Sequence, residues 1–163
     1  MQTKNNIQTS TNLPGILAKP FGYLPAKIHS QLLVVFLNRI LSVPLKEGDL
    51  DFLQNKKLII EVRDAYIRYS VSVVNGRLMA IPLDNNSDLM IKANMYDFLM
   101  LAARKEDPDT LVFQRRLVMQ GDTELGLELK NFLDGLDMES SGLFPVIESL
   151  LNKGLPLYRR LFA

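Results

Sequence analysis

The chain has 163 residues, with 19 basic and 18 acidic side chains and a formal net charge of +1. This near balance argues against a dedicated nucleic-acid binder, because such a protein usually carries a basic excess that pairs with phosphates. The absence of cysteine excludes disulfides, thiolate metal sites and a cysteine nucleophile, and the one histidine is too few for a histidine-cluster metal site. The length fits one domain with short extensions.

The first twelve residues, MQTKNNIQTSTN, contain one lysine and no apolar stretch, so they do not resemble a secretory signal. No apolar run is long enough to span a membrane. We therefore expect a cytoplasmic protein. Residues 1–27 are expected to form a polar tail followed by an irregular segment rich in proline and glycine.

The first regular element is a helix over residues 28–41, which we expect to end before Pro44. Its apolar residues recur at nearly the 3.6-residue period of a helix, at Ile28, Leu32, Val35, Phe36 and Ile40. Strands follow over 58–63, 66–74, 77–81 and 89–93, since these stretches are rich in β-branched and aromatic residues. In 66–74 apolar and polar residues alternate, which indicates a strand with one buried face. Asn75-Gly76 predicts a type I′ turn, and the four strands together predict an antiparallel meander.

After residue 93 the spacing of the apolar residues changes to the 3.6-residue period of helices. Asn94 is the expected N-cap of a helix, with Asp97 in its first turn, and Asp107-Pro108 predicts the start of a short helix that ends at Phe113. A strand is predicted over 116–120. A further helix is expected beyond Gly121-Asp122, where leucine and phenylalanine recur at Leu125, Leu129, Phe132, Leu133 and Leu136. The pattern therefore predicts an α+β domain with a mostly antiparallel five-stranded sheet covered by helices.

The C-terminal residues 138–163 carry two apolar faces at helical spacing, with Arg159 and Arg160 beside the second. Such a segment is expected to close over the domain, to lie in a membrane interface, or to pair two copies through Leu157, Tyr158 and Leu161. An equally favoured alternative is that this segment is permanently docked on the core of the domain.

Candidate catalytic and metal-binding groups are few. His29 has no serine, aspartate or cysteine partner at a suggestive spacing, so a surface or capping role is favoured over catalysis. Glu106, Asp107 and Asp109 stand at a helix start, where carboxylates accept free N–H groups, and this is favoured over a metal cluster. No phosphate-binding glycine motif occurs. No cofactor is therefore expected.

The segment AARKEDPDTLVFQRRLVMQGDTELGLELKNFLDGL, residues 102–136, together with SVVNGRL, residues 72–78, resembles the bacterial sterol carrier protein type 2 family. Within this family it is most similar to members that assist ubiquinone biosynthesis. The resemblance covers roughly residues 30–140. It implies a lipid-binding domain over 28–137, in which a mostly antiparallel sheet and its helices enclose an apolar tunnel.

The function that the resemblance implies is non-enzymatic lipid carriage. Its ligand would be a prenylated ubiquinone precursor or a phospholipid, and its partners the proteins of oxygen-independent ubiquinone hydroxylation, with contact at the inner membrane as a further expectation. The alternatives are a scaffold with a solid core in a quinone-biosynthesis complex and, as the least favoured, an enzyme that uses His29 or the acids near Asp107.

The residues expected to line the tunnel lie on helix faces and strands that face one another: Val71, Val73, Phe98, Leu99, Ala102, Leu117, Met119, Leu125, Leu129, Phe132 and Leu133. Basic residues are expected to contact an anionic headgroup or a membrane: Arg115, Arg116, Lys153, Arg159 and Arg160. For Arg115 and Arg116, and for the neighbouring Arg104 and Lys105, a solvated surface is the favoured alternative.

Overall fold

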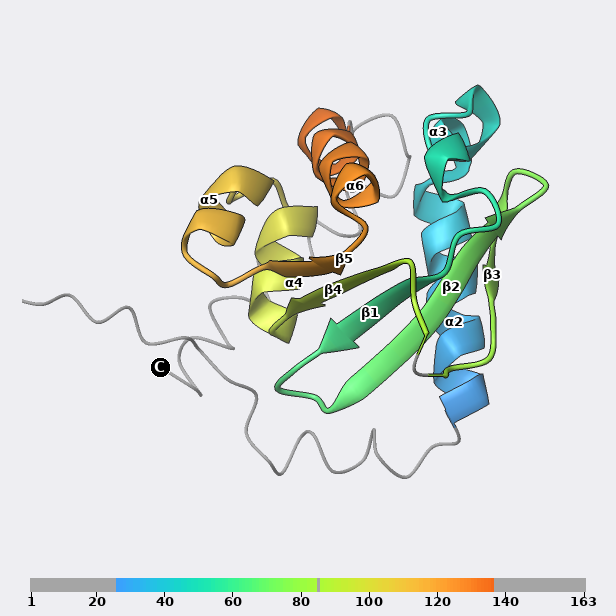
Figure 1. Ribbon diagram of the computed structural model, residues 1–163, viewed down its shortest axis with the longest axis horizontal. Coiled ribbons are helices and arrows are strands. Elements are labelled where there is room, and N and C mark those ends of the chain that lie inside the picture. The colour runs from blue at the N-terminus through green and yellow to red at the C-terminus, as the bar shows by residue number, and fades with distance from the viewer. Residues whose placement is uncertain (1–25, 85, 137–163) are drawn as a thin grey trace, which may run out of the picture.

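The computed structural model describes residues 26–84 and 86–136, and their side chains from Ser30 onwards. The N-terminal tail, the segment 138–163 and the side chain of His29 lie outside the described part. Within it, one mixed sheet carries two groups of helices (Figure 1). In chain order the elements are α2 (Ala26–Ile40), α3 (Ser42–Glu47), the 3₁₀ turn η1 (Asp51–Leu53), β1 (Leu58–Val62), β2 (Ile67–Val74), β3 (Arg77–Ala80), β4 (Leu89–Ala93), α4 (Met95–Ala102), α5 (Pro108–Phe113), β5 (Val118–Gly121) and α6 (Thr123–Gly135).

The sheet has five strands in the order β3-β2-β1-β4-β5, which confirms the α+β class and the mostly antiparallel sheet. The predicted meander holds for β1, β2 and β3 but is wrong for β4, which pairs parallel to β1. The outer edge of β3 is already occupied, because Asn38 of α2 donates to the Leu78 carbonyl at 2.8 Å and accepts from the Leu78 amide at 2.9 Å. Strand β4 lies at the other side of β1, where the Asp88 carboxylate accepts the Lys57 amide at 2.7 Å.

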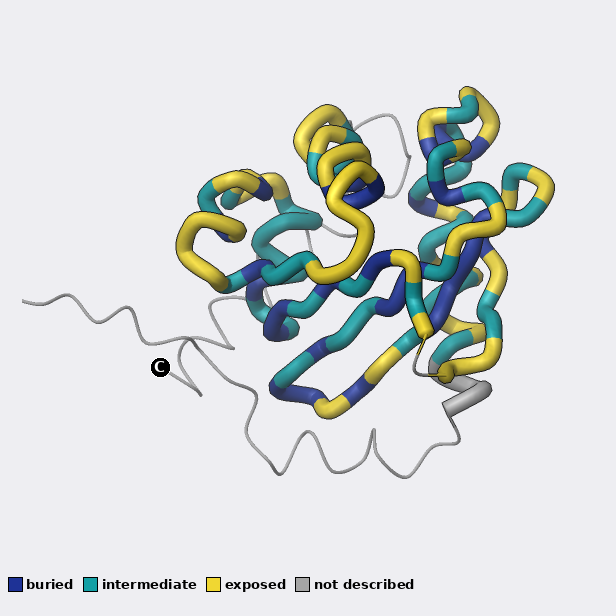
Figure 2. The backbone as a smooth tube through the Cα atoms, viewed as in Figure 1, coloured by how far each residue is buried: buried dark blue, intermediate teal, exposed yellow. Residues whose placement is uncertain are grey.

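The main core lies on the sheet face that α6 covers. Leu58, Val71, Leu89 and Ile91 point to this face and pack with Leu125 and Leu129 of α6. Figure 2 shows the buried residues concentrated in the strands and the exposed ones on the outer turns of α5 and α6. The expected one-sided burial of β2 is wrong in its second half, because Ser70 and Ser72 on the other face are buried as well.

Helix α2 is confirmed, and of the apolar positions that predicted it Ile40 is buried. Val34, Leu37 and Leu41 pack against the main core, whereas Leu32, Val35 and Phe36 are 65%, 68% and 50% exposed. The two sets lie on adjacent faces of the helix. Apolar periodicity alone did not distinguish which of them meets the sheet.

A short helix after α2 was not expected, since Pro44 was predicted to end the helix before it. The chain instead breaks at Leu41 and Pro44 lies in the first turn of α3. Proline is tolerated there because the first-turn amides have no intrahelical partner. Gly48 then ends α3 at a φ of 84°, in the left-handed region that favours glycine.

The predicted turn and caps are present, with one difference. Asn75 and Gly76 have φ values of 51° and 69°, as a type I′ turn requires. Asp107 accepts from the Thr110 amide at 2.7 Å and so caps α5. Asn94 is the N-cap residue of α4, but its side chain does not bond the first turn. Asp64 instead accepts the Met95 amide at 2.9 Å.

The Asp107 cap predicts a pH dependence of stability. The Thr110 hydroxyl and amide hold the pKa of Asp107 below its ordinary value of 3.8. The cap therefore stabilises the fold fully above pH 3.8, and this contribution is lost as the pH falls through the lowered pKa. We expect Asp107→Ala to unfold at a lower urea concentration than wild type at pH 7. The difference between the two urea midpoints should disappear at acidic pH. A difference between the two midpoints that does not change with pH would contradict the assignment.

Candidate functional site

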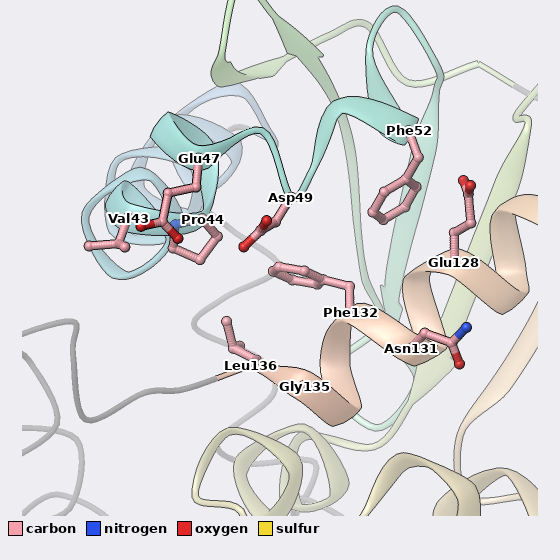
Figure 3. Close-up of a pocket in the computed structure, with 10 residues that line it drawn as sticks. All are labelled: Val43, Pro44, Glu47, Asp49, Phe52, Glu128, Asn131, Phe132, Gly135 and Leu136. Atoms are coloured by element: carbon pink, nitrogen blue, oxygen red, sulfur yellow. The ribbon is translucent and has the colours of Figure 1, made fainter.

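A pocket of about 540 Å³ opens between α3–η1 and α6 (Figure 3). The two walls come from elements far apart in the sequence, α3–η1 and α6, whose places in the fold can be followed in Figure 1. Ten residues line it: Val43, Pro44, Glu47, Asp49, Phe52, Glu128, Asn131, Phe132, Gly135 and Leu136. The volume is in the range of small-molecule pockets.

The apolar wall of the pocket continues the main core. Phe52 and Phe132 both pack against the core cluster, and their ring centroids lie 6.4 Å apart with the planes tilted by 55°. Figure 3 shows the two rings extending from η1 and α6 toward one another. Pro44 is buried, and Leu136 also packs with Ile40. A ligand here would therefore lie on side chains that are already fixed by packing.

The polar part of the lining is acidic. Glu47, Asp49 and Glu128 contribute carboxylates, Asn131 contributes an amide, and lysine and arginine do not occur among these ten residues. All four side chains are on exposed residues. Within the described ranges, none of the three carboxylates forms an ion pair. The pocket thus joins an apolar wall to a negatively charged rim.

Most of the residues expected to line a tunnel lie in the core. Eight of them belong to the main cluster or pack against it: Val71, Val73, Phe98, Met119, Leu125, Leu129, Phe132 and Leu133. Leu99 packs in the cluster around Ile40, Leu117 in the one around Leu111, and Ala102 is half-buried in α4. Phe132 alone among them also lines the pocket. The apolar pattern thus identified core-facing surfaces, and the tunnel lining stays a prediction.

One wall of the pocket, formed by α3 and η1, was missed by sequence reasoning altogether. These elements carry Val43, Pro44, Glu47 and Phe52, and neither element was expected. Gly48, which ends α3, was the available signal, because a glycine after a short apolar stretch is typical of a helix C-terminus.

Arg116 makes intramolecular ion pairs. Its guanidinium lies 2.6 Å from both the Asp97 and the Glu106 carboxylates, and its Nε donates to Asp97 at 2.8 Å. Burial lowers the pKa of Arg116, but the hydrogen bonds that its guanidinium donates to Glu106 and Asp97 outweigh this and raise the pKa above its ordinary value. Asp97, expected at the helix start for its dipole, is buried against this arginine.

The other candidate polar residues are dispersed. Arg115 is exposed at a φ of 58°, and Arg104 donates to the carbonyls of Asp134, at 3.0 Å, and Leu136 at the end of α6. Asp109 pairs with Lys130 at 2.8 Å, so Glu106, Asp107 and Asp109 have three different partners. The described residues hold no group of acids and histidine suited to a metal ion. Lys153, Arg159 and Arg160 lie outside the described residues.

A search for membrane-spanning helices among the described residues found none of sufficient length and apolar character.

Comparison with known proteins agrees with the fold. The chain is 43% identical over 126 residues to the ubiquinone biosynthesis accessory factor UbiT of Escherichia coli K12, a match that covers 77% of this chain and 72% of that protein. The same identity is found with UbiT of E. coli O157:H7. Among solved structures, the UbiJ-SCP2 ubiquinone synthesis protein superposes with a TM-score of 0.55 at 18% identity, covering 68% of this chain and 97% of that one.

The model of the SCP-2 sterol transfer family matches residues 37–134, which run from α2 nearly to the end of α6. This range includes every strand of the sheet and all the pocket residues except Gly135 and Leu136. The chain therefore belongs to the SCP-2 sterol transfer family.

Proposed function

We propose that the protein is a non-enzymatic lipid carrier that binds prenylated ubiquinone precursors and supports oxygen-independent ubiquinone biosynthesis. The observation that carries this proposal is the 43% identity to an accessory factor of ubiquinone biosynthesis, which extends over 77% of the chain. The family match and the apolar pocket between α3 and α6 support it. Proteins that hydroxylate the quinone ring in the absence of oxygen are the proposed partners.

Physical chemistry explains why such a pathway needs a carrier. Transferring one CH₂ group from water to an apolar site is favourable by about 0.8 kcal/mol, so a long prenyl chain has almost no free concentration in water. An enzyme in the aqueous phase can reach the ring of the precursor only if another protein surface shields the prenyl chain from water. Exchange between membrane and carrier is nearly balanced, because both sites are apolar.

The proposed working arrangement is a cytoplasmic protein that meets the inner membrane peripherally. The tail of the ligand would enter between the sheet and α4 and α6, among the core residues named above, and the basic residues Lys153, Arg159 and Arg160 would face anionic lipid. Residues 138–163 would act as the lid, or as the contact between two copies.

Native mass spectrometry of the full chain, followed by solvent extraction, tests the proposal. We expect a stoichiometric prenylphenol, quinone or phospholipid to leave with the protein, or to be taken up when apo protein is offered prenyl lipid. Protein that is apo and takes up no prenyl lipid would contradict lipid carriage. A charge placed directly in the predicted tunnel, as in Leu129→Arg, is expected to unfold the protein rather than only release lipid, since Leu129 is 4% exposed within the main core.

The exposed face of α2 favours a second candidate, a scaffold that binds partner proteins. Leu32, Val35 and Phe36 form an apolar face on the surface of the described domain. Replacing Val35 and Phe36 with serine should leave lipid content unchanged and weaken binding to the hydroxylation proteins in a pull-down. Loss of lipid from a folded variant would instead tie this face to carriage.

A further inference from the structure

The pocket between α3–η1 and α6 has a composition that restricts its ligand. We propose that it binds the ring of a prenylated phenol that carries no charge, and that it rejects the same phenol when the ring bears a carboxylate. This inference rests on the proposed function and specifies its substrate class. The observations behind it are an aromatic wall and an acidic rim, with no lysine or arginine among the lining residues that the structure describes.

The wall matches an aromatic ring with an apolar substituent. Phe52 and Phe132 are 6.4 Å apart at a tilt of 55°, within the 4.5–7 Å over which aromatic rings attract one another edge to face. A third ring can lie against either of them. Val43, Pro44 and Leu136 extend the apolar surface on the α3 side and offer contact to the first isoprene units. The pocket volume of about 540 Å³ suits a ring and a short part of the tail, so the remaining prenyl chain would lie elsewhere.

The rim distinguishes a neutral phenol from a carboxylated one. A phenolic O–H donates a hydrogen bond, and Glu47, Asp49 and Glu128 offer carboxylate acceptors, which form the stronger, charge-assisted kind. A carboxylate on the ring would be a fourth negative charge in the same pocket. Because lysine and arginine do not occur among the ten described lining residues, this charge would have no counter-ion among them. Like charges near a protein surface repel at these distances even after screening.

The α6 side of the pocket is held in place before any ligand arrives. Phe132 packs on the main core, and Arg104 donates to the backbone carbonyls of Asp134 and Leu136 at the C-terminal end of the helix. Such contacts fix the end of a helix through its otherwise unpaired carbonyls. A wall that is already ordered loses little entropy on binding, which increases selectivity for a ligand of matching shape.

A matched pair of soluble probes tests the charge selectivity. We would measure, by titration calorimetry on the full chain, the affinities of ortho-geranylphenol and of its para-carboxylated counterpart. The wild-type protein is expected to bind the uncharged phenol at least about tenfold more tightly. Equal affinities, or a preference for the carboxylated probe, would overturn the inference.

Variants locate the selectivity. Glu47→Gln combined with Glu128→Gln removes two rim charges from exposed positions, and we expect it to reduce the preference to less than about threefold. The control, Glu124→Gln combined with Asp134→Asn, removes the same charge from exposed residues of α6 outside the lining and should keep the preference. A preference that survives the rim variant, or falls equally in the control, places the selectivity elsewhere and overturns the inference.

A second pair of variants locates the ring. Phe132→Leu keeps an apolar side chain against the core but removes the aromatic face, so affinity for the neutral phenol should fall about fivefold or more. Leu127→Ala, on an exposed part of α6, should leave it unchanged. Phenol binding that Phe132→Leu does not weaken contradicts the pocket while leaving lipid carriage intact. Failure of both probes, with no lipid released from the native protein, contradicts the proposed function itself.

Discussion

Gly121→Ala is expected to destabilise the domain by about 3 kcal/mol, because two independent costs add at this position. A Cβ on Gly121 would lie 2.3 Å from the Asp88 carbonyl oxygen and 3.1 Å from the Leu89 Cα. Both are backbone atoms of the β4 end that pairs with β5, so neither can rotate away. The φ of 122° is in addition one that residues with a Cβ rarely adopt.

Urea unfolding at neutral pH measures this effect, and Gly126→Ala provides the matched control. Gly126 is in the interior of α6, where an added Cβ would lie 3.6 Å from Leu89 Cδ1, an ordinary contact. Alanine there is expected to be neutral or to stabilise by up to about 1 kcal/mol, since it has the higher helix propensity. Equal unfolding midpoints for the two variants would show that the close approach at Gly121 does not control the β4–β5 pairing.

The geometry at Gly121 also gives a physical reason for the Gly-Asp pair in the sequence. Gly121 permits the close approach of β5 to β4, and the next residue, Asp122, accepts the amides of Glu124 and Leu125 and so begins α6. The Asp122 amide also donates to the Asp88 carbonyl at 2.8 Å. Two residues thus end a strand, fix it to its neighbour and cap the helix that carries one wall of the pocket.

Features set by local chemistry were predictable from the sequence. Asn75-Gly76 and Asp107-Pro108 form the turn and the cap that their residue types favour, because the interactions involved span three or four residues. The sheet order was not predictable in this way. It places β4 beside β1, and the contacts that accompany this order, such as that between Asn38 and Leu78, join residues 40 positions apart and leave no periodic signal.

The pocket shows the same limit at the level of the candidate site. Apolar periodicity identified Leu125, Leu129 and Phe132 as one face of a helix, and all three meet the core. Whether such a face meets a ligand or another wall depends on what lies opposite. Opposite Phe132 is Phe52, in a 3₁₀ turn that follows an unpredicted helix. The aromatic pair therefore became visible only in three dimensions.

Arg116→Met is expected to destabilise the protein by about 3 kcal/mol, because it leaves a buried carboxylate without its partner. The Asp97 side chain is only 5% exposed and lies 2.6 Å from the guanidinium of Arg116, which also contacts Glu106 at 2.6 Å. The carbonyl of Arg116 accepts from Arg63 at 2.7 Å, so the same residue joins α4, the segment before β5 and the loop after β1. Arg115→Met, at the exposed neighbouring position, should change the free energy of unfolding by less than about 0.5 kcal/mol.

A double variant separates this ion pair from a headgroup contact. If Arg116 serves mainly to neutralise Asp97, then Asp97→Asn should recover part of the stability lost in Arg116→Met, since no buried charge then remains without a partner. Urea unfolding of the four proteins gives the coupling energy, and lipid extraction from each gives the ligand content per folded molecule. We expect strong coupling and unchanged lipid content. The opposite result is a folded Arg116→Met protein that keeps wild-type stability but loses its lipid. It would show that the positive charge of Arg116 acts on the lipid headgroup rather than on Asp97.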